Sequence, residues 1–234
     1  MKLLPSWAGL TLRARLLWRV LWRPTQLHTL PLVSCSPFEF LRPLVPDLPA
    51  LPPALSARTV PDDPTAAYVQ SSEPEVAELL FVLARLLTPA TITEVGVYRG
   101  FTSEYLAAAL PPAGRLHLLD VSAEALECGR RSAARQGQQP VLHLGLSTDP
   151  AVVGRLPDGQ DLVYLDADHS REGVRRELEL WLPKLRPGGL VAIHDSVGYD
   201  GICRTLNGYS TRYPAVTFAT PRGCGLTILR RVSE

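Results

Sequence analysis

Acidic residues directly follow two apolar stretches in the C-terminal half of the chain. Residues 162–165 are followed by Asp166, and residues 190–193 by His194 and Asp195. A carboxylate at the end of a buried strand is costly unless it is paired or binds a cation. Carboxylates with an imidazole suit Mg²⁺, Mn²⁺ or Ca²⁺, but a histidine that titrates near neutral pH can also act as a general base. Both interpretations stay open here.

A second candidate group surrounds a glycine-containing turn. Residues 93–103 read TEVGVYRGFTS, in which Gly96 and Gly100 allow a tight turn and a close approach of the backbone to a ligand. Dinucleotide sites use GxGxxG instead, and the acid Glu94 favours a cationic ligand over a pyrophosphate. Asp120 could accept both hydroxyls of a ribose. The alternatives are an ordinary turn and an acid at a helix N-terminus.

Alternating strands and helices are expected to position these groups. Ser72 with Glu75 has the pattern of a capping box, Thr102 or Ser103 is expected to cap the next helix, and further helices are expected to begin at Ser122, Asp149 and Ser170. Short apolar stretches predict strands at 92–97, 116–121, 141–144, 162–165, 190–193, 216–219 and 226–229. Continuous apolar strands are typical of a parallel sheet covered on both faces, and such sheets bind ligands beyond the carboxyl ends of their strands.

The first 70 residues have a different character. Residues 1–40 contain no acid before Glu39, and their arginines alternate with tryptophan and leucine. This pattern predicts a basic amphipathic helix, which packs on the domain or on a second subunit, or lies on a membrane surface through residues 1–25. Residues 41–70 are rich in proline, which predicts a linker or an extended wrap.

Composition limits the classes of function. The net charge of +1 gives no reason to expect a nucleic-acid partner. The four cysteines are far apart and form no CxxC pair, so neither a zinc site nor a disulfide framework is expected, and a cytoplasmic location fits best. No apolar stretch is long enough to predict a membrane-spanning helix.

Four segments resemble a known family: TEVGVYRGFTSEYLA, LLDVSAEAL, LVYLDADHSREGVRRELELWLPKLRPGGLVAIHDSV and GLTILRR. They are similar to the class I S-adenosylmethionine-dependent methyltransferases, and within these to small-molecule O-methyltransferases of the catechol and macrolide-sugar type. The resemblance covers about residues 70–231. It implies an α/β domain at residues 71–234, with a Rossmann-like, seven-stranded, mostly parallel sheet, an antiparallel last strand and helices on both faces.

The resemblance also implies roles for individual residues. Glu94, Gly96 and Gly100 would hold the amino-acid end of S-adenosylmethionine, and Asp120 its ribose. The other expected cofactor contacts are Val97, Tyr98, Thr102, Ser103, Val121, Ser147 and Asp166. Metal-dependent members would hold Mg²⁺ or another divalent cation at positions that correspond to Asp166, His194 and Asp195. His194 departs from the usual pair at this position, so the need for a metal stays open.

The predicted activity is methyl transfer to a hydroxyl of a small molecule, such as a sugar, a phenol or another natural product. The expected catalytic residues are Asp166, His169, His194 and Asp195, with His194 or His169 as the base if no metal takes part. Residues 199–213 are expected to roof the acceptor pocket. The alternative is a non-catalytic protein with the methyltransferase fold that serves as a partner- or membrane-attached binding module. A nicotinamide-dependent oxidoreductase is disfavoured by the missing GxGxxG, and a homo-oligomer stays open.

Overall fold

The computed structural model describes residues 50–52, 55, 72–220 and 224–232. The basic segment predicted for residues 1–40 and nearly all of the predicted linker at 41–70 lie outside the described residues. Within the part that is described, none of the helices combines the length and the apolar character needed to cross a bilayer.

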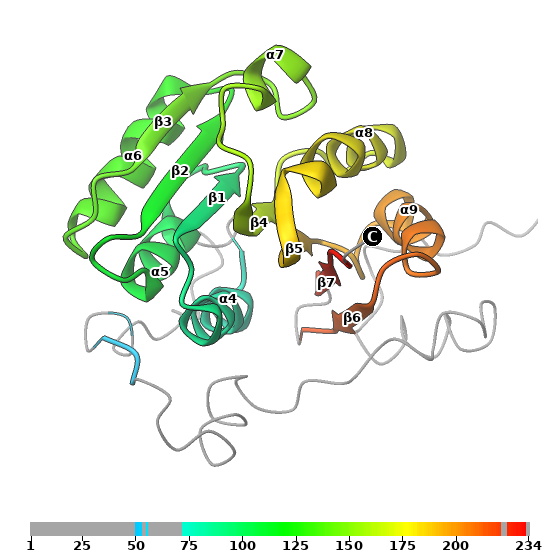
Figure 1. The fold of residues 1–234 in the computed structure, drawn as a ribbon, viewed down its shortest axis with the longest axis horizontal. Helices are drawn as coiled ribbons and strands as arrows, with labels where there is room; N and C mark the ends of the chain where they lie inside the picture. The colour runs from blue at the N-terminus through cyan, green and yellow to red at the C-terminus, as the bar shows by residue number, and fades with distance from the viewer. Residues whose placement is uncertain (1–49, 53–54, 56–71, 221–223, 233–234) are drawn as a thin grey trace, which may run out of the picture.

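A seven-stranded sheet in the order β3-β2-β1-β4-β5-β7-β6 forms the centre of the fold (Figure 1). β1 to β5 run parallel, and β7 runs antiparallel to both β5 and β6. This confirms the predicted fold class. The strands are β1 Thr91–Val95, β2 Arg115–Asp120, β3 Val141–Leu144, β4 Gln160–Leu165, β5 Leu185–His194, β6 Ala215–Phe218 and β7 Leu226–Arg230.

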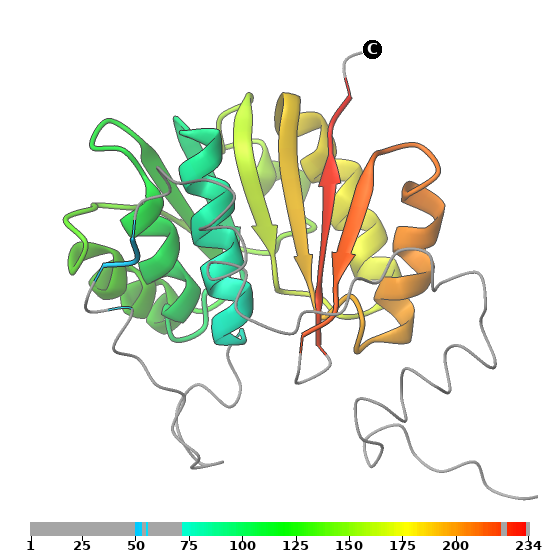
Figure 2. The same cartoon turned by 90° about the horizontal axis from the view of Figure 1, so that it is seen from below.

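Helices cover both faces of the sheet, which gives three layers (Figures 1 and 2). One face is covered by α4 Pro74–Leu87, α5 Phe101–Ala109 and α6 Ala123–Ala134. The other is covered by α7 Pro150–Val153, α8 Arg171–Trp181 and α9 Asp200–Tyr209, with the short 3₁₀ helix η4 Leu182–Lys184 after α8.

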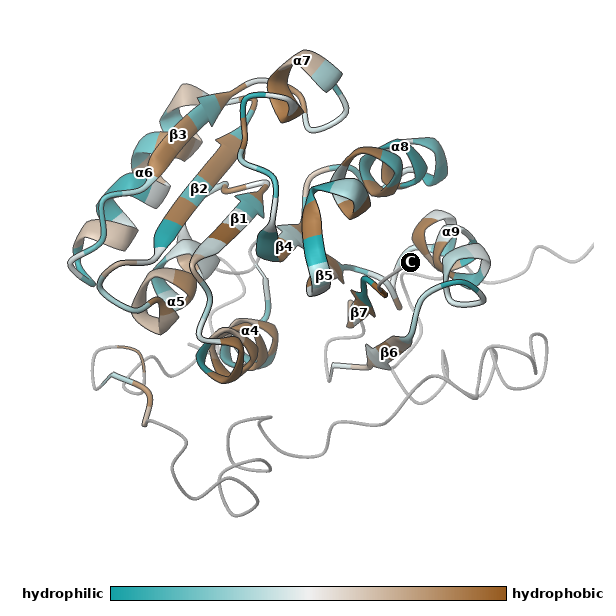
Figure 3. Ribbon diagram, viewed as in Figure 1, coloured by the Kyte–Doolittle hydropathy of each residue, from teal (hydrophilic) through white to brown (hydrophobic). Residues whose placement is uncertain are grey.

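Burial explains the apolar strands. Every residue of β4 is buried, because this central strand has a helical layer on each side. Figure 3 shows the same division, with hydrophobic colour along the central strands and much hydrophilic colour on α6 and α8. Two apolar clusters result, and each joins one face of the sheet to its own helices.

The helix starts predicted at Ser122, Asp149 and Ser170 are confirmed, because each side chain accepts a hydrogen bond from a backbone N–H in the first turn of its helix. The capping box at Ser72 is wrong. Glu73 occupies the N-cap of α4 without a side-chain cap. The Ser72 hydroxyl instead lies within hydrogen-bond distance of Tyr164 and Asp166, since these buried groups need partners.

The start of α5 also differs from the prediction. Gly100, rather than Thr102 or Ser103, is its N-cap, in a left-handed conformation with φ of 71°. A Cβ at Gly100 would lie 2.7 Å from the Cα of Gly129 on α6. Both the conformation and the close packing of α5 on α6 therefore require glycine at this position.

We expect Gly100→Ala to destabilise the domain by about 2–4 kcal/mol, because the left-handed conformation and the steric overlap each oppose a side chain. Gly137→Ala is the matched control, since Gly137 has φ of 76° but open space around its Cβ position. Urea unfolding should show a clearly smaller loss for the control. Equal losses would mean that packing against Gly129 contributes nothing.

Candidate active site

The carboxyl ends of four neighbouring parallel strands bring the predicted groups to one edge of the sheet. Glu94 lies near the end of β1, Asp120 ends β2, Asp166 follows β4 and His194 ends β5. Pairing of β1 with β2 and β4, and of β4 with β5, keeps these ends adjacent. The predicted convergence at one edge is therefore present.

The larger cavity at this edge has a volume of about 960 Å³. Its described lining includes the predicted cofactor contacts Gly96, Tyr98, Asp120, Val121, Ser147 and Asp166. The apolar side chains of Val121 and Leu146 are exposed along it and could cover a flat ring. Carboxylates beside apolar walls, in a cavity of this size, fit a nucleoside ligand.

Asp120 has three structural partners in addition to its place in the cavity, and one of them is the backbone N–H of Tyr98, which donates to Oδ2 at 3.3 Å. The same Oδ2 accepts a hydrogen bond from the backbone N–H of Val97 at 2.7 Å, and Oδ1 accepts one from that of Ser122 at 2.8 Å. The carboxylate therefore holds the glycine turn against the start of α6. Both sequence interpretations of Asp120, the ligand acid and the helix-start acid, are compatible with this position.

Glu94 is fully buried behind the glycine turn. The Ser103 hydroxyl donates to its Oε2 at 2.5 Å. Burial, with the negative charges of Asp166 and Asp120, raises the pKa of Glu94 to about 8 despite that hydrogen bond. A cationic group bound nearby would favour ionisation of Glu94, so the electrostatics fit the ammonium of an amino-acid ligand.

A second cavity of about 470 Å³ adjoins the first. Gly96, Tyr98, Asp166 and His169 line both cavities and so form a shared wall between them. The rest of its described lining is Ser72, Glu94, Val97, Thr102, His194, Asp195, Tyr199 and Cys224. Acids from separate strands thus share a cleft, as the enzyme interpretation requires.

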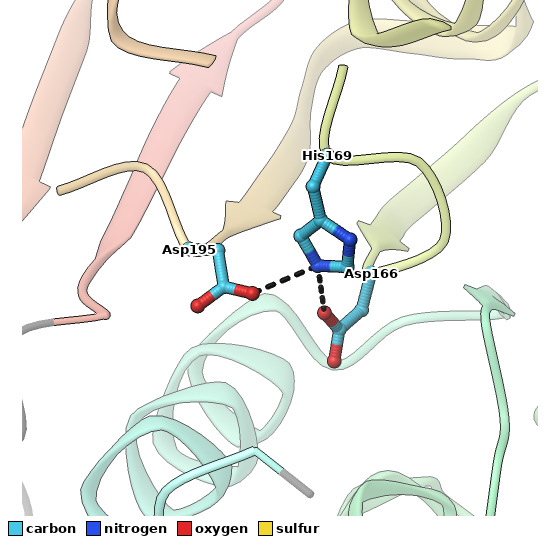
Figure 4. A group of neighbouring side chains, drawn as sticks. All are labelled: Asp166, His169 and Asp195. Atoms are coloured by element: carbon cyan, nitrogen blue, oxygen red, sulfur yellow. Dashed lines mark ion pairs between the residues drawn. The ribbon is translucent and has the colours of Figure 1, made fainter. Parts of the chain in front are cut away.

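Asp166, His169 and Asp195 form a compact cluster (Figure 4), in which Asp166 and His169 line both cavities and Asp195 lines the smaller one. His169 Nε2 lies 2.8 Å from Asp195 Oδ2 and 3.7 Å from Asp166 Oδ1. Hydrogen bonds to Asp166 and Asp195 raise the pKa of His169 to about 10, against the opposing effect of burial. Two carboxylates and one imidazole, with ligand atoms within 4.8 Å of one another, also fit a divalent cation.

The surroundings of His194 differ from those of His169. Its Nε2 is 2.6 Å from Glu73 Oε2 and its Nδ1 is 3.0 Å from Asp166 Oδ1. Burial lowers the pKa of His194, but the surrounding carboxylates together raise it well above its usual value. Because both ring nitrogens face carboxylates, the structure offers His169 rather than His194 as the imidazole ligand or base.

Both carboxylate oxygens of Asp166 have polar partners. Its Oδ2 accepts hydrogen bonds from the Ser72 and Tyr164 hydroxyls, each at 3.0 Å, while its Oδ1 faces His194. Burial raises the pKa of Asp166, but the charge of His194 and the contacts with His169 outweigh it and hold the pKa below its usual range. The carboxylate is therefore ionised and fixed in direction.

Several expectations about the lining need revision. Gly100 and Ser103 lie outside the described lining of both cavities, since Gly100 packs on α6 and Ser103 binds Glu94. Val97 and Thr102 line the smaller cavity rather than the larger. From the predicted roof at 199–213, Tyr199 lines the smaller cavity, with its ring centroid 4.8 Å from that of His169. The remainder of the roof belongs largely to α9 and lies outside that lining.

The sequence reasoning missed four residues of this region: Ser72, Glu73, Thr220 and Cys224. Glu73 and Thr220 are buried beside His194, and Cys224 lines the smaller cavity. No short-range pattern could have paired Glu73 with His194, which is 121 positions away. An acid directly before Pro74 was the available signal, and the sequence analysis assigned no role to it.

A buried carboxyl, that of Glu177, contacts Ser147 in the lining of the larger cavity. Glu177 of α8 accepts a hydrogen bond from the Ser147 hydroxyl at 2.5 Å, and Trp181 Nε1 donates to the Ser147 carbonyl at 3.1 Å. Burial raises the pKa of Glu177 to about 7, although the Ser147 hydrogen bond opposes this effect. The loop that carries Ser147 is therefore anchored to α8.

Comparison with known proteins agrees with this geometry. Residues 93–196 match the family model described as a methyltransferase domain. This part of the chain is therefore similar to a methyltransferase domain. The match includes the glycine turn, Asp120 and the whole Asp166–His169–Asp195 cluster, and it confirms the resemblance to the class I methyltransferases.

The chain is similar to curated relatives over part of their length. It is 32% identical over 124 residues to catechol O-methyltransferase domain-containing protein 1 of Mus musculus, covering 51% of this chain and 47% of that protein. It is 29% identical over 150 residues to a catechol O-methyltransferase of Niastella koreensis, covering 62% of this chain and 65% of that protein. The chain thus spans about half to two thirds of the length of these relatives.

Solved structures share the fold of this chain. An O-methyltransferase from Bacillus cereus, in complex with SAH, has a TM-score of 0.60 at 20% identity, covering 72% of this chain and 84% of that chain. The O-methyltransferase TomG from Streptomyces achromogenes, in complex with SAM, has a TM-score of 0.62 at 22% identity, covering 83% of this chain and 95% of that chain. At these identities the likeness bears on the fold.

Glu177 predicts a specific pH dependence of stability. Its pKa is about 7 in the folded protein and 4.5 in an ordinary environment, so the folded state binds the extra proton and loses stability as pH rises from about 4.5 to 7. We expect Glu177→Gln to remove this decline and to stabilise the domain at pH 8 by on the order of 1–3 kcal/mol.

The matched control is Glu179→Gln, the same chemical change at a half-exposed position of the same helix. Thermal unfolding from pH 5 to pH 8 should give parallel curves for the wild type and the control, and a flatter curve for Glu177→Gln. A Glu177→Gln curve parallel to the wild type would contradict the assignment of a buried, neutral Glu177.

Proposed function

We propose that this protein transfers the methyl group of S-adenosylmethionine to a hydroxyl oxygen of a small molecule. The observation that supports this most directly is the pair of adjoining cavities with a shared wall at Gly96, Tyr98, Asp166 and His169. Transfer between two bound molecules needs a donor space and an acceptor space that meet at one point. Holding both reactants in such a geometry can contribute about 7–11 kcal/mol toward the barrier.

The larger cavity suits the donor. Asp120 is available for the ribose, Val121 and Leu146 for the purine, and the loop at Ser147 closes the far side. Asp166 places negative charge near the other end, and Glu94, which lines the adjoining smaller cavity, would ionise beside an amino-acid ammonium bound there. When bound, S-adenosylmethionine supplies an electrophilic methyl group.

The smaller cavity suits the acceptor. His169 lines it, and Asp195 orients the imidazole through the 2.8 Å contact. We assign His169 as the group that takes the hydroxyl proton while the oxygen forms its bond to the methyl carbon and the carbon–sulfur electrons leave with sulfur. Positive charge brought in by a ligand would lower the raised pKa of His169 and so prepare it to accept that proton.

A divalent cation is the second candidate for activating the hydroxyl. Asp166, His169 and Asp195 would hold it, and it would lower the pKa of the acceptor hydroxyl. Methyl transfer measured after chelation of metal ions distinguishes activation by His169 from activation by a cation. Activity that survives EDTA supports His169 as the base, and activity that is lost but restored by Mg²⁺ or Mn²⁺ supports the cation.

The cellular setting of the chain is the subject of three further predictions. Peripheral membrane contact through residues 1–25, a cytoplasmic location and a homo-oligomer stay predictions from the sequence. A binding module without catalysis remains the alternative function. Calorimetric titration with S-adenosylmethionine against NADH, followed by assay of labelled methyl transfer to phenolic and sugar hydroxyls, separates enzyme, binding module and oxidoreductase.

We expect Asp195→Asn to lower kcat by about 10²–10⁴-fold, because His169 loses its orienting carboxylate. The affinity for S-adenosylmethionine should change less than about threefold, since Asp195 lines the acceptor cavity rather than the donor cavity. Asparagine is chosen because Asp195 has φ of 55°, a conformation that asparagine tolerates better than alanine.

Asp120→Asn is the reciprocal variant. It should weaken donor binding by about tenfold, as expected for loss of a charged hydrogen-bond partner, and leave kcat at saturating donor largely intact. Calorimetry and initial rates measure both quantities. Equal loss of affinity and turnover in the two variants would contradict the division into donor and acceptor cavities.

A further inference from the structure

Glu73 is a buried carboxylate that the proposed reaction does not use directly. It stands at the N-cap of α4 and is 3% exposed, yet it makes no side-chain cap of that helix. Its Oε2 is 2.6 Å from His194 Nε2, and its Oε1 accepts a hydrogen bond from the Thr220 hydroxyl at 2.7 Å. Both oxygens therefore point toward the sheet rather than toward the helix.

The contact with His194 continues to the centre of the site. His194 Nδ1 is 3.0 Å from Asp166 Oδ1, so a single imidazole connects Glu73 to the carboxylate shared by both cavities. An imidazole between two carboxylates can donate from both nitrogens, and its plane is then fixed at both ends. Without Glu73, one ring nitrogen of a buried histidine would lose its partner.

Ser72, the residue before Glu73, contacts the other carboxylate oxygen of Asp166. The Ser72 hydroxyl donates to Asp166 Oδ2 at 3.0 Å, and it accepts a hydrogen bond from the Thr102 hydroxyl at 3.0 Å. Two consecutive residues before α4 thus reach both oxygens of Asp166, one directly and one through His194. The direction of Asp166 depends on the chain segment that leads into α4.

We propose that Glu73 is a positioning residue, which holds His194 and through it the shared carboxylate Asp166 in the orientation that methyl transfer requires. This inference rests on the proposed function. A purely structural role, in which Glu73 only ties α4 to the sheet through Thr220, is the competing explanation. The two differ in what they predict for turnover.

Glu73→Gln keeps the shape of the side chain and removes its charge. We expect kcat to fall about 10–100-fold, because a small misplacement near the reacting atoms is enough for such a loss. The Kd of S-adenosylmethionine should stay within about threefold, since Asp120 and the loop at Ser147 are unchanged. Thr220→Val is the matched control, because it removes the other hydrogen bond of Glu73 and should reduce stability with little effect on kcat.

Two further measurements test the route through His194. In a double-mutant cycle, Glu73→Gln should add little to the kcat loss of His194→Gln, since both variants break the same connection. In NMR spectra of the ¹⁵N-histidine-labelled protein, the His194 Nε2–H proton should be strongly downfield in the wild type and in Thr220→Val, and shifted in Glu73→Gln. If Glu73→Gln does not fold, Glu73→Asp keeps the charge but shortens the reach, and the same kcat loss is expected.

A kcat for Glu73→Gln within twofold of the wild type, or an equal kcat loss in Thr220→Val, would overturn the proposal. Fully additive losses in the cycle would overturn it as well. If the wild type transfers no methyl group at all, the proposed function fails. The NMR comparison then still tests the link from Glu73 to His194 separately.

Discussion

The structure of this site depends on keeping an ionised carboxylate, Asp166, where a fully buried strand reaches the edge of the sheet. Burial alone would favour the neutral acid or would destabilise the fold. Hydroxyls of Ser72 and Tyr164 on one oxygen and the imidazole of His194 on the other meet that requirement. Because Asp166 lies in the wall between two cavities, the same contacts that stabilise it also give it a fixed direction.

Charge balance connects the rest of the site to that carboxylate. Glu73 and Asp195 add negative charge around Asp166, and two histidines, His194 and His169, face these three acids. The histidines differ in their surroundings. His194 is buried with both nitrogens engaged, whereas His169 is partly exposed and lines both cavities. The first is suited to support the site, and the second to meet a substrate or a cation.

The glycine turn shows how backbone geometry and chemistry are combined. A Cβ at Gly96 would lie 2.3 Å from the Asp166 carbonyl oxygen, so the turn after β1 packs directly on the end of β4. This close approach brings the turn, Glu94 and Asp166 together in the described part of the fold. Gly100 instead permits α5 to approach α6. Glycine is therefore required at the two positions of this motif for different physical reasons.

Local patterns in the sequence were enough to predict the sheet, most of the helix starts and the acids at the ends of β1, β2, β4 and β5. Continuous apolar strands report burial on both faces, and parallel strands place their carboxyl ends together, so both conclusions follow from residue order alone. Serine and aspartate caps at Ser122, Asp149 and Ser170 act within one helical turn, so these helix starts could also be predicted from the sequence.

Only the tertiary structure decided which residues meet. The sequence left His194 and His169 as alternative bases and placed only His194 in the metal set. The difference between them comes from Glu73, which reaches His194 from 121 positions away. Ser72 had the pattern of a helix cap, but in the folded protein its hydroxyl forms hydrogen bonds with the buried hydroxyl of Tyr164 and the carboxylate of Asp166 instead. Such choices depend on distances between distant segments, because a hydrogen bond forms with whichever partner folding places within reach.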